Sequence, residues 1–507
     1  MAYISCMKKE KSLRSDDWEF LKLLAESASV NPFSDTYREL QMKIADCDAS
    51  VPPDEQYRRV AVRVDKHVRR MEAVGLADIR KFNDASREDM RTVRYAMMLD
   101  AYYRYLTELD RLIHDQAESG DRPIQVSFAA DIMGLLTKRG FNNEEALHYF
   151  AVLHQLRRAF FFIDRGLIGR SASMKQLRRL LWNNVFTCDI RLYEQKLYDR
   201  MEDFSTMLLG ETGSGKGAAA AAIGRSGYIP FDEKKKTFAE SFTRSFTALN
   251  LSQFPESLIE SELFGHRKGA FTGAIEAHDG VLVRCSPHGA IFLDEIGEIG
   301  IPAQIKLLCV LQERFFTPVG AHEKLRFRGR IIAATNKPLA TLLQNGIFRE
   351  DFFYRLCSDI IAVPSLRQRI AEEPQELSDL TALIVKRIIG DTSPEIVNSI
   401  EKILRITPGP HYAWPGNVRE LEQSIRRILL TREYSGNFDI ANTNLCDFLQ
   451  EGIQAGELDA NTLLAGYCRL LYQRLGSYEA VAVRTRLDRR TVKAYIEKYA
   501  LESQVSA

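Results

Sequence analysis

The stretch Leu208-Leu-Gly-Glu-Thr-Gly-Ser-Gly-Lys216 decides the fold of this chain. It follows a short apolar run and precedes the alanine-rich segment Ala218–Ile223, which is the strand, loop and helix context of a phosphate-binding loop. Its glycines let the backbone curl until successive N–H groups point at phosphate oxygens, and the helix start adds its positive dipole end. The residues expected to bind a nucleotide here are Gly210, Glu211, Thr212, Gly213, Ser214, Gly215, Lys216 and Gly217.

Position 217 departs from the usual phosphate loop. It is glycine, where Ser or Thr generally supplies a hydroxyl that holds magnesium. A glycine-rich turn that binds no ligand is the alternative interpretation, but the strand, loop, lysine and helix together favour a nucleotide. We therefore expect Gly217 to alter metal or nucleotide affinity without abolishing function.

A second apolar run ends in two acids, in Ala290-Ile-Phe-Leu-Asp294-Glu295. The pair alone is a weak signal, but downstream of a phosphate loop it becomes a strong one. Phosphoryl transfer depends on positioning and charge stabilisation, so both carboxylates must lie at the strand's end beside the loop. We expect Asp294 to hold Mg²⁺ through water and Glu295 to polarise the attacking water, with ATP and Mg²⁺ as cofactors.

Between these two motifs lies Glu262-Leu-Phe-Gly-His-Arg-Lys-Gly-Ala-Phe-Thr-Gly-Ala274. Gly269 and Gly273 predict a flexible tip on which Phe271 and Thr272 are displayed. An exposed phenylalanine leaves apolar surface in water unless it meets a partner, so the tip is expected to bind another molecule. A plain glycine turn with a buried phenylalanine is the alternative.

With this hexapeptide, the chain from about residue 166 to 435 resembles the AAA+ activators of sigma-54 RNA polymerase, the bacterial enhancer-binding proteins. The resemblance implies that the loop extends toward sigma-54 when ATP drives it upward. Phe271 and Thr272 would then make the contact. The contact residues that it implies are Gly269, Ala270, Phe271, Thr272, Gly273 and Ala274.

The same resemblance assigns further catalytic roles. Asn250 matches the asparagine that restrains Glu295 until the loop has moved, and Asn336 matches the sensor of the γ-phosphate. Arg349 and Arg355 match two arginine fingers, which stabilise transition-state charge on the nucleotide of the adjacent subunit. Because such a site is completed by a neighbour, the resemblance implies a ring, and a homo-hexamer is expected.

The segment Trp414-Pro-Gly-Asn-Val-Arg419 matches the second sensor motif of the family, in a helical lid. Its proline and asparagine suit a helix start, which places Arg419 on the first turn, where it would face the nucleotide. A surface salt bridge is the alternative role for Arg419.

The carboxyl-terminal segment 461–507 carries eight Lys or Arg and four Asp or Glu, a local basic excess in a chain whose net charge is +1. Its helical stretches 477–486 and 488–499 resemble the Fis-like helix-turn-helix of sigma-54 activators, although Arg486 stands where glycine is common and would need positive φ. A plain basic tail is the alternative, and Asp488 is expected to cap the second helix. The expected contacts to double-stranded upstream DNA are Arg489, Arg490, Thr491 and Lys493.

The amino-terminal part reads as successive amphipathic helices. It lacks the βα alternation and paired strand-end acids of a receiver domain. The basic segment 58–70 favours a solvated helix face over a partner surface. Tyrosines at 102, 103 and 105 and the phenylalanines at 160–162 favour core packing over a ligand pocket.

The fold class is therefore multidomain: an all-α N-terminal domain, an α/β AAA+ P-loop ATPase with a helical lid, and a C-terminal helix-turn-helix. The boundaries we expect are 1–165 for a helical sensory or regulatory domain, 166–390 for the ATPase domain, 391–440 for the lid, and 441–507 for a linker and the Fis-like domain.

The start of the chain lacks the apolar core of a signal peptide, and its apolar stretches are too short to span a bilayer. The scattered cysteines, with no CxxC pair, indicate reduced thiols and a cytoplasmic protein without a membrane partner.

The function expected is that of a sigma-54-dependent transcriptional activator, which binds DNA and uses ATP hydrolysis to convert the closed polymerase complex into an open one. A DNA-binding regulator with a decayed motor would show damage in the acids, fingers or loop, and only Gly217 departs. A general AAA+ remodeller gives no reason for the hexapeptide 269–274 to occur with a DNA-binding end.

Overall fold

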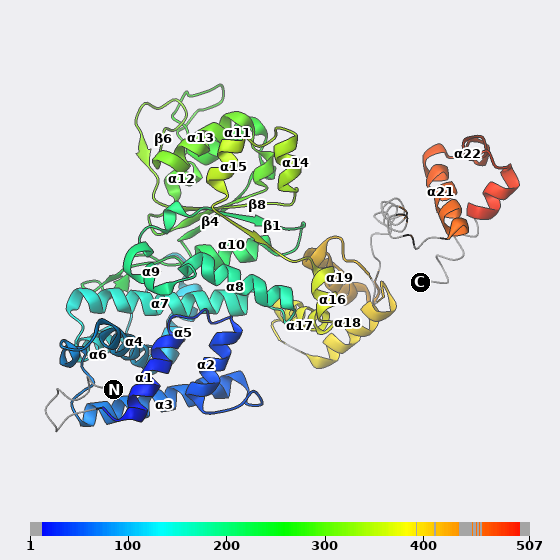
Figure 1. The fold of residues 1–507 in the computed structure, drawn as a ribbon. Coiled ribbons are helices and arrows are strands. Elements are labelled where there is room, and N and C mark those ends of the chain that lie inside the picture. The colour runs from blue at the N-terminus through cyan, green and yellow to red at the C-terminus, as the bar shows by residue number, and fades with distance from the viewer. Residues whose placement is uncertain are drawn as a thin grey trace. The chain divides into compact units, whose positions relative to one another are not determined.

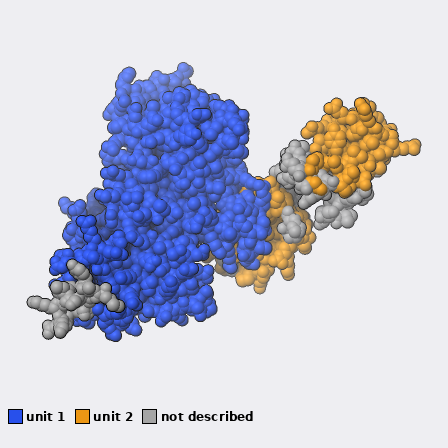
Figure 2. All heavy atoms as spheres, in the orientation of Figure 1, with its two compact units in different colours: residues 1–376 blue, residues 377–507 orange. Residues whose placement is uncertain are grey.

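The computed structural model describes residues 13–391, 393–409, 412–434 and 459–496, together with Leu449, Ile453 and Gly456. Two compact units make up the chain, residues 1–376 and residues 377–507, coloured separately in Figure 2. The first unit contains the N-terminal helices and a parallel sheet with its covering helices (Figure 1). The helical and α/β regions expected from the sequence are both present.

The N-terminal helices begin where the sequence supplies caps. Ser34, Ser86 and Asn142 stand at N-caps, and each side chain accepts a hydrogen bond from a backbone N–H of the first turn. Glu145 bonds back to the N-cap backbone of α7 and completes a capping box. The helices are α1 (Ser15–Ser27), α2 (Asp35–Ala45), α3 (Pro53–Ala73), α4 (Arg87–Arg104), α5 (Leu106–Ser119), α6 (Ala129–Lys138) and α7 (Asn143–Gly166).

Helix α3 carries the basic segment 58–70, and three of its four valines lie in the core, while Val62 and the arginines face solvent fully or in part. His67 stacks on Phe20 with ring centroids 3.9 Å apart, and its Nδ1 lies 2.7 Å from Oδ1 of Asp17. The segment is therefore an amphipathic helix with a solvated face, as predicted, and His67 is a core histidine. The buried valines are Val60, Val64 and Val68.

The sheet of the first unit has five parallel strands in the order β4-β5-β8-β1-β9. Three of them, β1, β5 and β8, occupy short apolar runs of the sequence. Both faces of the sheet are covered, which is why these strands read as continuous apolar runs. The strands are β1 (Thr206–Leu209), β4 (Phe246–Asn250), β5 (Ala290–Asp294), β8 (Arg330–Thr335) and β9 (Asp359–Ala362).

Two helical layers enclose this sheet (Figure 1). Alternate strand residues point to opposite faces, so that Ile291 and Leu293 join one cluster while Phe292 joins the other. The accompanying helices are α8 (Ala172–Phe186), α9 (Ile190–Leu192), α10 (Lys216–Gly224), α11 (Glu256–Phe264), α12 (Val281–Arg284), α13 (Ile301–Glu313), α14 (Leu339–Gln344), α15 (Glu350–Leu356) and α16 (Leu366–Glu372).

A short hairpin after α10 belongs to the core of the N-terminal helices. Its strands, β2 (Phe231–Asp232) and β3 (Thr237–Phe238), pack their phenylalanines against Phe150 of α7. The backbone N–H of Val126 donates to the carbonyl of Lys236 at 2.9 Å, which ties the hairpin to the loop before α6. The apolar core of the helical region therefore extends past residue 165 and includes residues 229–242.

The second unit begins within α17 (Gln375–Ile389) and continues through α18 (Pro394–Ile406) and α19 (Asn417–Thr431). Further along lie α21 (Ala460–Leu475), α22 (Tyr478–Thr485) and the helical residues 489–496. These last three helices share a small core of Cys468, Leu471, Val481, Val492 and Ile496.

Candidate functional site

The phosphate loop lies between β1 and α10, at the carboxyl edge of the sheet. Gly213 and Gly215 adopt φ of 77° and 109°, the left-handed region that glycine enters without strain. Lys216 Nζ donates to the carbonyls of Gly210 and Glu211, at 2.8 and 3.2 Å, which holds the ammonium over the loop. Ser214 is 5% exposed, and its Oγ has no hydrogen-bond partner among the described residues. A curled backbone, a positioned ammonium and an orphaned hydroxyl fit a phosphate group.

Two glycines of this loop differ in the space around them. A Cβ at Gly210 would lie 2.8 Å from the carbonyl oxygen of Val363, so the tight turn has no room for a side chain. At Gly217 the nearest atom to a Cβ would be a ring carbon of Phe292 at 3.9 Å, an ordinary contact. A lack of room therefore does not explain why position 217 carries glycine where phosphate loops usually carry Ser or Thr.

Asp294 and Glu295 follow at the end of β5, two strands along from β1. Asp294 is in register with Asn250 of β4, so the predicted restraining asparagine and the acids share one sheet edge. Glu295 adopts φ 55°, which ends the strand abruptly. The Oδ1 of Asn250 accepts bonds from the N–H and hydroxyl of Ser252, at 3.0 and 2.8 Å. In this conformation the amide of Asn250 is thus anchored to the turn that follows it.

Asn336 follows β8, the strand between β5 and β1. Its Nδ2 donates to Oγ1 of Thr212 at 2.9 Å, so the predicted sensor contacts the phosphate loop directly. Arg367 of α16 forms an ion pair with Glu211 on the other side of the loop. Sequence reasoning did not find Arg367, because a lone arginine on a surface helix carries no local motif.

The two arginines predicted as fingers lie at and within α15, on the surface of the first unit. Arg349 precedes the helix and forms a two-pronged ion pair with Asp351, at 3.0 and 2.8 Å, and this hydrogen bonding lowers the pKa of the Asp351 carboxyl. Arg355 donates to the carbonyl of Leu311 at 3.2 and 3.1 Å. Both guanidinium groups are positioned by local contacts and remain at the surface.

The segment 269–274 forms a compact turn between α11 and α12. The N–H of Gly269 donates to the carbonyl of Ala274 at 2.8 Å, and the N–H of Ala274 donates to Phe271 at 3.0 Å. His266 and His278 exchange two backbone hydrogen bonds of 2.9 Å each, which fixes the base of the loop. The loop is therefore a preformed projection on a paired stem.

The side chains at the tip are exposed, with one internal support. Phe271 is 39% exposed and meets the ring of His266 edge-on, with centroids 4.9 Å apart. Thr272 is exposed. A second loop lies against the first, since a Cβ at Gly320 would come within 2.8 Å of Ala270 Cβ. This second loop joins the short strands β6 (Phe315–Phe316) and β7 (Leu325–Arg326).

In the second unit, Arg419 lies on the first turn of α19, as predicted, and is exposed. Trp414 and Asn417 take positive φ of 51° and 55°, and both side chains are buried. Glu420 steadies the turn by accepting from the N–H of Gly416 at 2.8 Å and from the hydroxyl of Tyr412 at 2.6 Å.

At the carboxyl-terminal end, α22 and the helical residues 489–496 are joined by a tight turn. Arg486 adopts φ 57° there, so the positive φ predicted for this position is present. Asp488 caps the following helix, because its Oδ1 accepts from the N–H groups of Arg490 and Thr491 at 2.8 and 3.1 Å. Val492 is fully buried. The residues proposed as DNA contacts lie directly after this cap in the chain. They are Arg489, Arg490, Thr491 and Lys493.

Residues 191–361 match the family model described as the sigma-54 interaction domain. Over these residues the chain is similar to the sigma-54 interaction domain. This domain is an AAA+ ATPase module, and in this chain it contains the phosphate loop, the paired acids and the hexapeptide 269–274.

Curated relatives are similar to part of this chain. The chain is 37% identical over 285 residues to the DNA-binding transcriptional regulator NtrC of Azospirillum brasilense, covering 55% of this chain and 51% of the relative. It is 41% identical over 229 residues to the Nif-specific regulatory protein of Azotobacter vinelandii, covering 45% of this chain and 40% of the relative. The chain therefore spans about half the length of the curated relatives it matches.

Among solved structures, NtrX from Brucella abortus matches 74% of this chain and 80% of its own, with a TM-score of 0.39 and 18% identity. Within the described residues, no helix is long and apolar enough to cross a membrane. The part of the chain that the structure describes also holds no group of three or more His, Cys, Asp or Glu arranged for a metal ion.

Proposed function

We propose that this protein is a transcriptional activator that hydrolyses ATP to convert the closed complex of sigma-54 RNA polymerase into an open one. The observation that carries the proposal is the exposed projection 269–274 on the same compact unit as a phosphate loop and its paired acids. A motor and a tip in one rigid body can transmit a nucleotide-dependent change to a bound partner.

In this proposal the carboxyl edge of the sheet binds and hydrolyses ATP. Asp294 would hold Mg²⁺ through water, and the metal would supply positive charge to the phosphates. Lys216 and the loop N–H groups orient the phosphates. Glu295 accepts a hydrogen bond from the attacking water, and Asn336, already bonded to Thr212, reports on the outer phosphate.

The surface arginines fit a site shared between subunits. Arg349 and Arg355 are held at the surface by Asp351 and by the carbonyl of Leu311, outside the unit's own phosphate loop. In a homo-hexamer each would reach the neighbour's nucleotide. An arginine finger there stabilises the charge of the transition state and raises the hydrolysis rate by several powers of ten. Arg349→Ala should then lose turnover, and mixed rings with an Arg349-intact, Glu295→Gln neighbour should recover part of it.

Binding to upstream DNA is assigned to the carboxyl-terminal helices. The capped helix beginning at Arg489 presents basic side chains at its start, as a recognition helix in the major groove does. Arg489 and Lys493 would supply phosphate contacts and therefore salt-dependent affinity. The lid residue Arg419 is proposed to sense the nucleotide.

The deciding experiment uses the full chain, ATP and a closed complex of sigma-54 polymerase on its promoter, with strand opening read by permanganate reactivity. Wild type should open the promoter. Thr272→Ala should hydrolyse ATP at the normal rate and fail to open it, while Thr107→Ala, at an exposed site on α5, should behave as wild type. ATP hydrolysis without opening by wild type would mean that the motor acts on another protein.

A further inference from the structure

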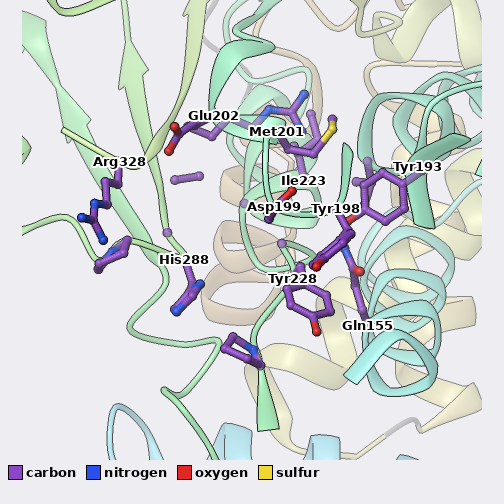
Figure 3. Close-up of a pocket in the computed structure, with 18 of the residues that line it drawn as sticks. Gln155, Tyr193, Tyr198, Asp199, Met201, Glu202, Ile223, Tyr228, His288 and Arg328 are labelled. Carbon is purple, nitrogen blue, oxygen red and sulfur yellow. The ribbon is translucent and has the colours of Figure 1, made fainter. Parts of the chain in front are cut away.

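A cavity of about 450 Å³ lies at the amino edge of the sheet, opposite the phosphate loop (Figure 3). Ala290 and Arg330, the first residues of β5 and β8, form part of its wall. Gln155 of α7 closes it from the N-terminal helices. A volume of this size falls in the range of small-molecule sites.

One wall of the cavity is aromatic. The rings of Tyr198 and Tyr228 meet edge-on with centroids 4.8 Å apart, and His148 stands behind Tyr198 at 4.5 Å. Ile223, at the end of α10, adds an apolar surface beside them. Such a wall accepts a flat ring through stacking and apolar contact.

The opposite wall carries three basic side chains, Arg326, Arg328 and His288, and one acid, Glu202, which lies near enough to the two arginines to interact with their charge. Figure 3 shows Arg328 and His288 approaching the cavity from the side facing the tyrosines. Arg326 and Arg328 are exposed, and neither forms an ion pair with any described residue. Arg330 also lines the cavity, but its donors are used by Asn184, Phe204 and Thr206. The two outer arginines are therefore the groups available for an anion, which the guanidinium fork binds through paired hydrogen bonds.

Hydrogen-bond acceptors complete the lining. Gln155 is 1% exposed, and its Nε2 donates to the hydroxyl of Tyr193 at 2.6 Å and to the carbonyl of Ser226 at 2.9 Å. Its Oε1 is buried and has no hydrogen-bond partner among the described residues. Asp199 supplies a further acceptor beside it in the cavity (Figure 3). Asp199 is exposed at the lining, so its carboxylate is the acceptor that an amino or ring N–H of a ligand can reach.

We propose that this cavity is a regulatory site for a nucleoside monophosphate. The base lies against Tyr198 and Tyr228 and donates to Asp199, and the phosphate binds Arg326 and Arg328. The site is separate from the phosphate loop in position and in residues. Its ligand class is fixed by the combination of flat ring, N–H donor and anion.

Three elements connect the two sites. Helix α10 begins with Lys216 and ends with cavity residues Ile223 and Gly224, and β5 and β8 each run from the cavity to the catalytic edge. A ligand that shifts α10 or the strand starts therefore changes the position of the catalytic groups. This coupling rests on the proposed ATPase function, whereas binding does not.

Binding is tested on the full chain by calorimetry with AMP and with GMP. The Lys216→Ala background removes the phosphate loop as a competing site. We expect at least one of the two to bind in that background, and Arg328→Ala to weaken binding by about tenfold to a hundredfold. Arg244→Ala, at another exposed arginine, should bind as the parent does. Thermal melting of each variant confirms folding.

Four results would overturn the proposal. The first is that neither AMP nor GMP binds in the Lys216→Ala background. The second is that neither Arg328→Ala nor Tyr228→Leu changes binding. Adenosine or guanosine binding as tightly as its monophosphate would remove the anion site, and inorganic phosphate binding as tightly would remove the base site. If the wild type hydrolyses no ATP, the proposed function fails while these binding results still decide the site.

Discussion

The two edges of the parallel sheet are built in different ways. At the carboxyl edge, short sequence motifs place each functional group through the backbone: the curled phosphate loop, the left-handed Glu295 and the Asn336 that follows β8. At the amino edge, the wall is assembled from α7, the residues after α10 and the loops before β5 and β8, which are far apart in sequence. No motif marks any of these segments.

The difference shows in the polar groups as well. At the carboxyl edge, Lys216, Asn336 and Asn250 have hydrogen-bond partners, and the Oγ of Ser214 is buried without one among the described residues. At the amino edge, helix α7 contributes three side chains with buried polar atoms that have no hydrogen-bond partner among the described residues. These belong to His154, Gln155 and Arg158. Since orphaned buried groups destabilise a fold, their concentration on one helix face points to a role other than stability.

The largest effect expected is on chemistry at the carboxyl edge. Glu295→Gln keeps the shape and the left-handed backbone but removes the charge that polarises water, so ATP turnover should fall by about a hundredfold to ten-thousandfold. Nucleotide binding should remain, measured with a fluorescent ATP analogue. Glu298→Gln is the matched control, because Glu298 lies on the same turn but pairs with Lys337. Equal losses in both variants would remove Glu295 from its role.

The carboxyl edge of the sheet was largely predictable from the sequence. A glycine that must take positive φ, or an acid at the end of an apolar strand, is visible in the sequence and indicates the site directly. The strands β1 and β5 were found in the same way. The edge strands β4 and β9 were not found, because both are partly exposed and lack a continuous apolar run. The hairpin of β2 and β3 is too short for a periodic pattern, and its packing against α7 is a long-range contact.

The second effect tests the N-terminal helices that support the amino edge. Arg139 is fully buried and pairs with Asp100 at 2.7 Å and Glu72 at 2.7 Å. Arg139→Ala removes the partner of Asp100 Oδ2, while Arg104 still pairs with Oδ1 at 2.7 Å, and should lower the unfolding free energy of this region by about 1–3 kcal/mol. Hydrogen exchange of α4 and α6 measures the loss. Lys138→Ala, at an exposed neighbour that pairs with the same Glu72, should cost under about 1 kcal/mol.

The third effect is a pH dependence located at the amino edge. His154 is buried against Phe238, and burial, together with the charge of Arg158, lowers its pKa well below the ordinary value. The unfolded chain takes up the proton below about pH 6.5 while the folded chain does not. Stability is therefore present above that pH and is lost as pH falls, by at most about 1.4 kcal/mol per pH unit for this group.

Hydrogen exchange of α7 between pH 7.5 and 5, corrected for intrinsic rates, should show this loss. His154→Leu should reduce the slope of stability against pH but should not abolish it. Burial also lowers the pKa of His148 and His288, so these two histidines contribute to the same slope. His114→Leu, at an exposed histidine, should leave the slope unchanged. An unaltered slope in His154→Leu would show that His154 does not drive it.

The smallest effect expected returns to the carboxyl edge, at its one departure from the usual motif. Gly217 is the second residue of α10, is exposed, and has room for a Cβ. Ala removes backbone entropy from the unfolded chain without a steric clash, so Gly217→Ala should stabilise the ATPase region by roughly 0.5–1 kcal/mol in urea unfolding. Gly210→Ala should do the opposite, because its Cβ would press on the carbonyl of Val363.

Gly217→Ser then separates stability from metal binding at the same position. It adds the hydroxyl that phosphate loops use to hold magnesium, and it should lower the Mg²⁺ concentration needed for half-maximal ATP turnover. If Gly217→Ala gives the same Mg²⁺ dependence as Gly217→Ser, the hydroxyl is not a ligand in this loop. Asp294 would then be sufficient to hold the metal. The glycine at position 217 would be a loss of the hydroxyl that the loop tolerates, and would not adjust the affinity for Mg²⁺.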